Sequence, residues 1–251
     1  MQLVWNSAEV THRGNRRKLN EDAVLSRPGI GLWVVADGMG GHHAGDLASQ
    51  SIVAALGALE PASTLAAQVD SVEAALLDVN QQLRLHATRC GVGTTIGSTV
   101  VAMMARGAIG VALWAGDSRL YRLRGERFEQ ITRDHNPVSD LLDAGTVTEA
   151  EAEAADTNII TRAVGGQPRL FLDVAVFDVA PEDTYLLCSD GLYRELDAAA
   201  LTERLAGAAR DGLDTTAEQL LAACLGGAAR DNVSLVIARA DSAPRATGAA
   251  S

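Results

Sequence analysis

Short apolar runs bounded by glycine or charged residues dominate this chain and predict a strand-rich domain. The first clear run, Gly-Leu-Trp-Val-Val-Ala at 31–36, predicts a buried strand. A glycine-rich loop comes after it. Apolar residues then recur at three- and four-residue steps, which predicts two helices, over about 45–59 and 64–86.

The remainder of the chain mixes further strands with short helices. The apolar runs predict strands at 94–105, 108–115, 119–124, 127–132, 172–178, 184–189 and 232–238. Helical spacing returns at about 201–206 and 215–225. Because strand runs are interleaved with helix pairs, without regular strand–helix alternation, we expect an α+β fold with a mainly antiparallel core.

Two segments lack this apolar pattern. Residues 133–166 are polar and acidic, with short helical pieces, and are interpreted as an inserted flap. Residues 241–251 are small and polar, and such a composition buries too little surface to fold, so we expect a disordered tail. The prediction is one domain over residues 1–240, followed by this tail.

Composition narrows the classes of function. The chain has 251 residues, of which 47% are hydrophobic and 4% aromatic, so Ala, Val and Leu must fill most of its core. Its formal net charge of -11 repels nucleic acid and anionic lipid, and we expect neither as a partner. The long apolar stretch 94–116 is interrupted by Arg106 and Gly107, which favours two strands joined by a turn over a membrane helix.

The cysteines and the N-terminus indicate a cytoplasmic protein. Cys90, Cys188 and Cys224 are far apart and odd in number, which argues against a disulfide framework or a structural zinc site. The first residues have neither the basic region nor the apolar stretch of a signal peptide. We expect a cytoplasmic monomer.

Four aspartates lie at the ends of predicted strands. Asp37, Asp117 and Asp190 come directly after apolar runs, and Asp231 directly precedes one. In an antiparallel arrangement these ends meet, so the carboxylates can converge on one edge. Such a cluster repels itself unless hard divalent cations offset the charge. The pattern therefore predicts a site for oxygen-bound cations.

Each aspartate alone has a simpler interpretation. Asp-Gly is a common hairpin turn, although a predicted helix comes after Asp37-Gly38 and no clear strand comes after Asp190-Gly191. Asp117 lies between two predicted strands, where a plain hairpin turn explains it as well as a ligand does. Asp231-Asn232 taken singly is an ordinary loop pair. The four together are the stronger signal.

Six ordered motifs resemble the type-2C, metal-dependent protein serine/threonine phosphatases in their bacterial form. The resemblance spans roughly residues 7–239. The motifs are Gly14-Asn-Arg-Arg17-Lys-Leu-Asn-Glu21-Asp22, Val35-Ala-Asp37-Gly38-Met-Gly-Gly-His42-His-Ala-Gly45, Gly93-Thr-Thr95, Gly116-Asp117-Ser-Arg119, Ser189-Asp190-Gly191 and Asp231-Asn232.

The resemblance implies an antiparallel β-sandwich flanked by helix pairs (αββα) and a centre of two or three Mn²⁺ or Mg²⁺ ions. Asp37 would bridge two cations, and the Gly38 carbonyl would bind the second. Asp190 and Asp231 would complete the first site. A third, weaker cation would lie between Asp117 and Asp190, helped by Asn158, while Glu21 and Asp22 would act through metal-bound waters.

The implied reaction is hydrolysis of phosphoserine and phosphothreonine in proteins by a metal-activated water. Two adjacent cations neutralise the phosphate dianion and lower the pKa of that water. Arg17 would grip the phosphoryl oxygens, because a planar guanidinium fits them. His42 would protonate the leaving oxygen, with His43 the poorer candidate. The implied partners are phosphorylated proteins, among them a bacterial serine/threonine kinase and its targets.

Two other functions fit parts of the sequence. Cys188 and Arg194 have the C-x5-R spacing of cysteine-dependent phosphatases, although Asp190 would place a negative charge inside their phosphate cradle. An inactive phosphatase-like binding module would lack metal ligands, but Asp37, Asp190 and Asp231 are all present.

Overall fold

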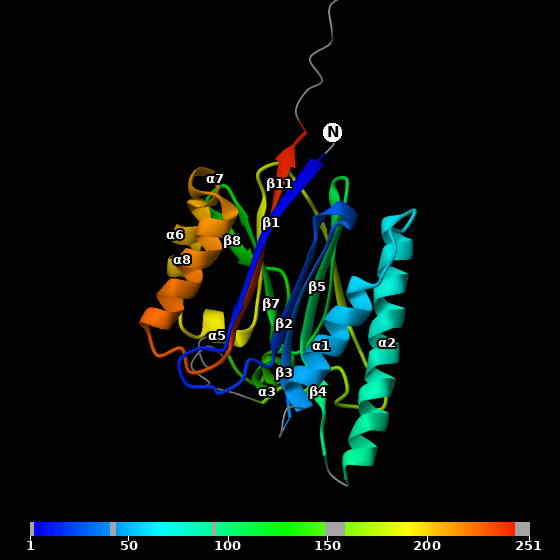
Figure 1. Ribbon diagram of the computed structural model, residues 1–251. Helices are drawn as coiled ribbons and strands as arrows, with labels where there is room; N and C mark the ends of the chain where they lie inside the picture. Colours follow the sequence, from blue (N-terminus) through cyan, green and yellow to red (C-terminus); the bar gives the residue numbers. More distant parts are fainter. Residues whose placement is uncertain (1–2, 41–43, 92–93, 149–158, 244–251) are drawn as a thin grey trace, which may run out of the picture.

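Two antiparallel sheets pack face to face between two layers of helices in the computed structural model, which describes residues 3–40, 44–91, 94–148 and 159–243 (Figure 1). This confirms the expected αββα sandwich. Within those residues, no helix combines the length and apolar character that a membrane crossing requires.

Neighbouring strands in both sheets are mostly distant in sequence. One sheet has the order β1 (Leu3–His12), β11 (Val233–Ser242), β10 (Thr184–Cys188), β7 (Arg119–Arg124) and β8 (Arg127–Gln130). The other has the order β2 (Asp22–Arg27), β3 (Leu32–Met39), β5 (Val100–Arg106), β6 (Ile109–Ala115) and β9 (Asp173–Asp178), with β4 (Gly97–Ser98) paired to β3. All the ladders are antiparallel.

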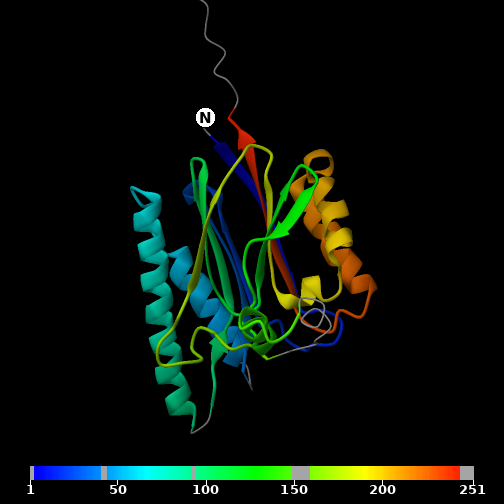
Figure 2. The same ribbon diagram turned by 180° about the vertical axis from the view of Figure 1, so that it is seen from behind.

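Helices cover the outer face of each sheet, as Figures 1 and 2 show. The β3-containing sheet is covered by α1 (Ala44–Gly57) and α2 (Leu65–Cys90), and the other sheet by α6 (Ala198–Ala206), α7 (Ala208–Asp211) and α8 (Leu213–Gly226). Thr64 caps α2 by accepting a hydrogen bond from the Ala67 N–H at 3.1 Å. The short elements are η1 (Pro28–Ile30), α3 (Pro137–Asp143) and α5 (Asp190–Tyr193).

The apolar run of β3 is continuous because both faces of the strand are buried. Leu32, Val34 and Ala36 pack against the α1–α2 layer, whereas Trp33 and Val35 face the other sheet. Tyr185 of β10 lies in the same layer between the sheets. As expected, small and medium aliphatic side chains make up most of the core.

The chain ends differ from expectation. The apolar pattern does not single out β1 or β2, because β1 mixes polar and apolar residues and is only half buried. β11 runs to Ser242, so the expected boundary at residue 240 is too early: Asp241 and Ser242 pair with β1. Of the expected tail, residues 244–251 lie outside the described residues.

The flap segment is anchored at both ends. His135 is buried, and its backbone N–H donates to the Gly116 carbonyl at 2.9 Å. Val164 exchanges two backbone hydrogen bonds of 2.9 Å with Ser98. The polar composition of 133–166 therefore does not reveal that His135 and Val164 are buried against the sandwich. Residues 149–158, the middle of the flap, are outside the described residues.

Candidate active site

In Figure 1, α5 and β4 lie at the end of the sandwich away from the N-terminus. Several carboxylates gather at this end. An open cavity of about 960 Å³ occupies this end. Its lining includes seven of the predicted site residues: Arg17, Glu21, Asp37, Gly38, Asp117, Asp190 and Asp231. The structure therefore brings together side chains that are up to 214 positions apart.

Asp37 lies inside β3 rather than after it, directly across the ladder from Asp22 of β2. Its backbone is fixed by Thr99, whose hydroxyl accepts the Asp37 N–H at 3.1 Å and whose N–H donates to the Asp37 carbonyl at 2.9 Å. Asp22 is buried, and one carboxylate oxygen accepts the Ser189 hydroxyl at 2.8 Å. Strand register thus places these two acids side by side.

Gly38 allows the start of α1 to approach β3. A Cβ there would lie 2.1 Å from the Gly45 carbonyl oxygen, closer than any real contact. The Gly38 N–H donates to the Glu21 carbonyl at 3.0 Å, and the Ser49 hydroxyl donates to the same oxygen at 2.6 Å. The backbone of Glu21 is therefore held against both elements, while its side chain lines the cavity.

Asp190 and Asp231 come together because α5 packs against the start of β11. A Cβ on Gly191 would lie 1.9 Å from the Asn232 carbonyl oxygen. The Asn232 side chain accepts the Glu21 N–H at 2.8 Å and donates to the carbonyls of Arg13 and Leu19. Asn232 therefore ties the loop that carries Arg17 to the acidic end, a role that its place in a motif does not reveal.

Asp117 is not a hairpin turn residue. It connects β6 to β7, and these strands belong to different sheets. Its carbonyl accepts the Tyr193 hydroxyl at 3.0 Å. Arg119 holds Asp134 through its guanidinium and stacks 3.6 Å above the Tyr193 ring centroid. The contacts that fix the Asp117 loop therefore come from α5 and from the base of the flap.

Burial and mutual repulsion raise the pKa values of the acids. Burial and, secondarily, Asp190 and Asp231 raise the pKa of Asp22 to about 7. Burial and the charge of Asp190 raise the pKa of Asp117 to about 6. The pKa of Asp37 is raised well above its ordinary value, by burial first and then by Asp22 and Asp190. The fold therefore places each of these acids where ionisation is less favourable than in water.

Two of the carboxylates have a buried oxygen that accepts no hydrogen bond from the described residues. Asp22 Oδ1 and Asp190 Oδ1 are buried and have no hydrogen-bond partner within the part of the chain that the structure describes. A donor set made only of carboxylate and carbonyl oxygens suits Mg²⁺ or Mn²⁺. Unpaired oxygens and raised pKa values are both relieved by divalent cations, so Asp37, Gly38, Asp190 and Asp231 fit a metal centre.

Arginines hold the acids in this arrangement. Arg17 Nη2 lies 2.7 Å from Asp231 Oδ2, and Arg194 Nε lies 3.0 Å from Asp190 Oδ2. Over residues 3–40, 44–91, 94–148 and 159–243, no three His, Cys, Asp or Glu side chains already stand as a ligand set around one point. Loading a cation at Asp231 therefore requires its contact with Arg17 to change.

Other sequence-based expectations meet different outcomes. His42, His43 and Asn158 lie outside the described residues. Cys188 points into the core beside α8, where burial raises the pKa of its thiol, and this contradicts a thiolate nucleophile. Arg194 contacts Asp190 rather than forming a phosphate cradle with Cys188.

Comparison with known proteins gives the same picture. Residues 11–226 match the family described as protein phosphatase 2C. The chain is 36% identical over 244 residues to the serine/threonine protein phosphatase PstP of Mycobacterium tuberculosis, covering 94% of this chain and 45% of PstP. It thus spans less than half of that relative. It is 35% identical over 210 residues to the protein phosphatase PhpP of Streptococcus pneumoniae, covering 77% of this chain and 81% of PhpP.

Solved structures are similar over nearly the whole fold. PppA, described as a key regulatory component of T6SS in Pseudomonas aeruginosa, superposes with a TM-score of 0.85 and 43% identity, covering 94% of this chain and 97% of PppA. The catalytic domain of PstP in complex with two manganese ions gives a TM-score of 0.82 and 33% identity, covering 96% of this chain and all of that one.

Proposed function

This chain belongs to the protein phosphatase 2C family, and we propose on that premise that it hydrolyses phosphoserine and phosphothreonine in proteins with the help of divalent cations. The observation that carries the proposal is the meeting of Asp37, Asp190, Asp231 and Arg17 in one open cavity. Its relatives PstP and PhpP are named as phosphatases, and PstP has been solved with two manganese ions.

Asp37, Asp190, Asp231 and the Gly38 carbonyl would hold the cations, which we propose to be Mn²⁺ or Mg²⁺. When bound, such ions supply Lewis-acid polarisation of the phosphate ester and a water of lowered pKa. Asp22, which is buried beside Asp37, and Glu21, whose side chain lines the cavity, would support this centre through metal-bound waters.

Arg17 would bind the phosphoryl group. Its side chain is half exposed and is already aimed into the cavity by its contact with Asp231. If Asp231 held a cation, the Arg17 guanidinium would be free to bind the phosphate, whose oxygens match its planar fork. His42 would then supply the proton that the leaving serine or threonine oxygen needs.

The substrates would be phosphorylated proteins, including a serine/threonine kinase and its targets in the same cytoplasm. The cavity is open and its lining is charged, which suits a phosphorylated side chain presented from a protein surface. A small metabolite would instead favour an enclosed pocket. We propose that the chain acts on such proteins as a monomer.

The test is Mn²⁺-dependent release of phosphate from a phosphothreonine peptide, with a chelator as the reverse arm. Arg17→Ala should lower kcat/KM about 10- to 100-fold, since a charge-assisted contact is lost. Arg16→Ala is the matched control, because Arg16 is an exposed neighbour that does not line the cavity.

Three outcomes would count against the proposal. Turnover that survives chelation would exclude a metal-dependent reaction. Equal losses in the Arg16 and Arg17 variants would remove the assigned role of Arg17. No turnover of any phosphorylated peptide or protein with Mn²⁺ or Mg²⁺ would favour the inactive binding module.

A further inference from the structure

Arg194 stands between two of the acids that the family resemblance assigns to a third cation. It lies one helical turn after Asp190 in sequence, and its Nε is 3.0 Å from Asp190 Oδ2. Its Nη2 is 3.7 Å from Asp117 Oδ2. The Arg194 side chain is only 32% exposed and lines the cavity, so the guanidinium belongs to the site.

The surroundings hold Arg194 in that place. Its backbone N–H donates to the Asp190 carbonyl at 3.0 Å, at the end of α5. The preceding residue, Tyr193, donates its hydroxyl to the Asp117 carbonyl and is covered by the Arg119 guanidinium. α5 and the Asp117 loop are therefore linked through Tyr193, and Arg194 extends from this linked unit toward both carboxylates.

A third cation does not fit beside this guanidinium. Arginine remains charged at every working pH, so it cannot make room for a metal by losing a proton. A divalent ion bound by Asp117 and Asp190 would lie within a few ångströms of a fixed positive charge. The same two carboxylates would also lose their existing partner. Asp231, which belongs to the two-cation site, is paired instead with Arg17.

We propose that Arg194 is a resident cation that replaces the third metal ion, so that the working centre of this protein holds two divalent cations. The guanidinium offsets charge on Asp117 and Asp190 and keeps both carboxylates in place without a third metal ion. This inference rests on the proposed metal-dependent function of the same site, and it concerns the number of ions rather than their presence.

The test is the number of Mn²⁺ ions bound per chain, measured by equilibrium dialysis with elemental analysis up to millimolar Mn²⁺. The wild-type chain should bind two. Arg194→Gln should bind a third, weaker ion, and Arg194→Gln combined with Asp117→Asn should return to two. Arg194→Lys should stay at two, because the positive charge is kept.

Arg230→Gln is the matched control, because Arg230 also lines the cavity but has no ion pair with Asp117 or Asp190 among the described contacts. Its count should stay at two. Circular dichroism and the two tight ions establish that each variant is folded.

A wild-type count of three would overturn the inference, as would a folded Arg194→Gln chain that still binds only two. A wild-type chain that binds no ion would overturn the proposed function, and this inference with it. The two failures are therefore distinguishable.

Discussion

Several acidic side chains in and beside the cavity are harder to ionise than the same side chains in water. Asp22, Asp37, Asp117 and Asp190 have raised pKa values because burial and neighbouring negative charges both oppose ionisation. Two arginines offset part of this charge through Asp231 and Asp190. Substitutions here should therefore change metal binding and turnover more than folding.

Asp37→Asn and Asp231→Asn should each abolish nearly all turnover while the chain remains folded. Loss of a partner one contact away from a metal already costs about 10- to 100-fold, and a direct ligand should cost more. Steady-state kinetics at saturating Mn²⁺ measure the loss. Asp70→Asn, on the exposed face of α2, is the control; near wild-type turnover in either site variant would refute the ligand assignment.

Cys188→Ser should leave kcat within about twofold, since the thiol lies in the core and not in the cavity. The new hydroxyl should instead lower the free energy of unfolding by about 1–3 kcal/mol, because it is buried in an apolar setting. Phosphatase assays and urea melts on the same sample separate the two effects. A variant that is fully folded but has no phosphatase activity would support the cysteine-dependent mechanism.

Among secondary-structure elements, register and close approach decide where the site forms. The β2–β3 ladder sets Asp22 opposite Asp37. β10 ends beside β11, so that Ser189 and then Asp190 arrive next to Asp231. Two glycines without room for a side chain, Gly38 and Gly191, let α1 and β11 come close enough to complete the edge.

Gly191→Ala should disrupt the acidic end, since its Cβ would lie 1.9 Å from the Asn232 carbonyl oxygen. The contact involves backbone on both sides, so α5 must shift away from β11 and separate Asp190 from Asp231. Turnover should fall at least about 100-fold, in line with the sensitivity of reactions to displacements of about 1 Å. The control is Gly226→Ala in α8, where a Cβ meets nothing within 4 Å; equal effects in both variants would contradict this account.

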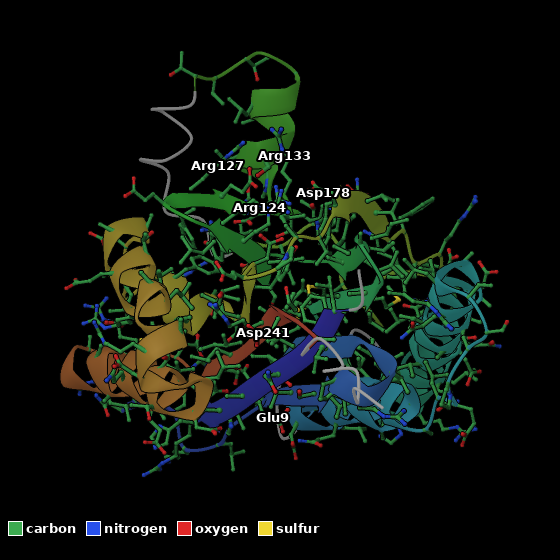
Figure 3. All side chains as sticks on the ribbon, turned by 90° about the horizontal axis from the view of Figure 1, so that it is seen from above. Glu9, Arg124, Arg127, Arg133, Asp178 and Asp241 are labelled. Atoms are coloured by element: carbon green, nitrogen blue, oxygen red, sulfur yellow. The ribbon has the colours of Figure 1, made fainter. Side chains whose placement is uncertain are left out.

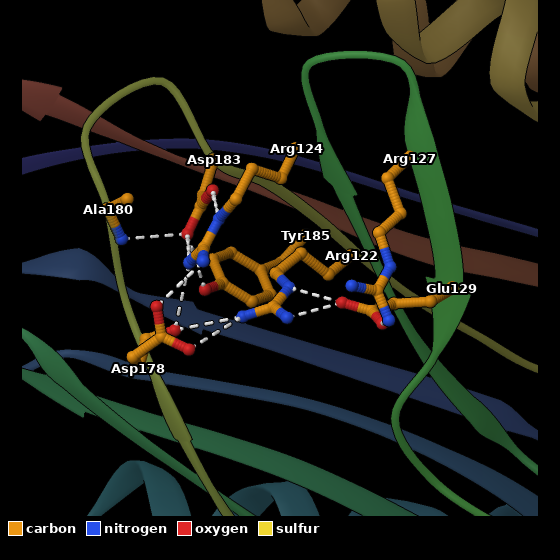
Figure 4. A network of polar contacts seen from close by, with 8 residues as sticks. All are labelled: Arg122, Arg124, Arg127, Glu129, Asp178, Ala180, Asp183 and Tyr185. Carbon is orange, nitrogen blue, oxygen red and sulfur yellow. Dashed lines mark hydrogen bonds and ion pairs between the residues drawn. The ribbon is translucent and has the colours of Figure 1, made fainter.

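Across the whole molecule, an ionic network ties the two sheets together at the end opposite the cavity (Figures 3 and 4). The Asp183 side chain is fully buried and accepts hydrogen bonds from Arg124 at 2.7 Å, the Ala180 N–H at 2.8 Å and the Tyr185 hydroxyl at 3.0 Å. Arg124 also contacts Asp178 of β9, in the other sheet, at 2.7 Å. This network therefore joins the sheets where no cation is expected.

Asp183→Ala should lower the free energy of unfolding by about 3 kcal/mol, because it leaves buried partners without their acceptor. Arg127→Ala, in the same network, should cost less than about 1 kcal/mol, since the Arg127 side chain is 76% exposed. Urea unfolding monitored by tryptophan fluorescence compares them. Similar losses in the two variants would mean that burial does not set the strength of this network.

Divalent cations should raise the melting temperature, because they bind the folded chain and relieve its crowded carboxylates. Binding at a hundredfold excess over Kd contributes about 2.7 kcal/mol, which corresponds to roughly 5–10 °C for a domain of this size. Asp37→Asn should blunt the response. A wild-type melt that ignores Mn²⁺, Mg²⁺ and chelator alike would mean that these acids hold no metal.

The raised pKa values of these acids should make the metal-induced rise in melting temperature depend on pH. The pKa of Asp22 rises from its ordinary value to about 7 on folding, so between about pH 4 and 7 the folded chain binds more protons than the unfolded chain. The acids' contribution to the free energy of unfolding of the metal-free chain therefore falls as pH rises through this window. Because metal needs the ionised form, the Mn²⁺-induced rise in melting temperature should be larger at pH 7.5 than at pH 5; the reverse order would contradict the shift.

The amino-acid sequence by itself determined the strands from residue 31 onward, the four longer helices and the family. Those elements carry apolar periodicities that need no knowledge of their neighbours, as in β7, whose bounds match the predicted 119–124. The acids were identifiable too, because motif order along the chain is a local property of the sequence. The half-buried β1 was not, since its polar face hides the alternation.

Only the tertiary structure decided how these residues meet. Asp117 connects the two sheets instead of closing a hairpin, because β6 pairs with β5 and β9 in one sheet whereas β7 pairs with β10 and β8 in the other. Cys188 faces the core and Arg194 faces the acids, although the two residues are the ends of the same C-x5-R spacing. Which way a side chain points, and which charge it meets, depends on packing between distant segments, and no local pattern records that.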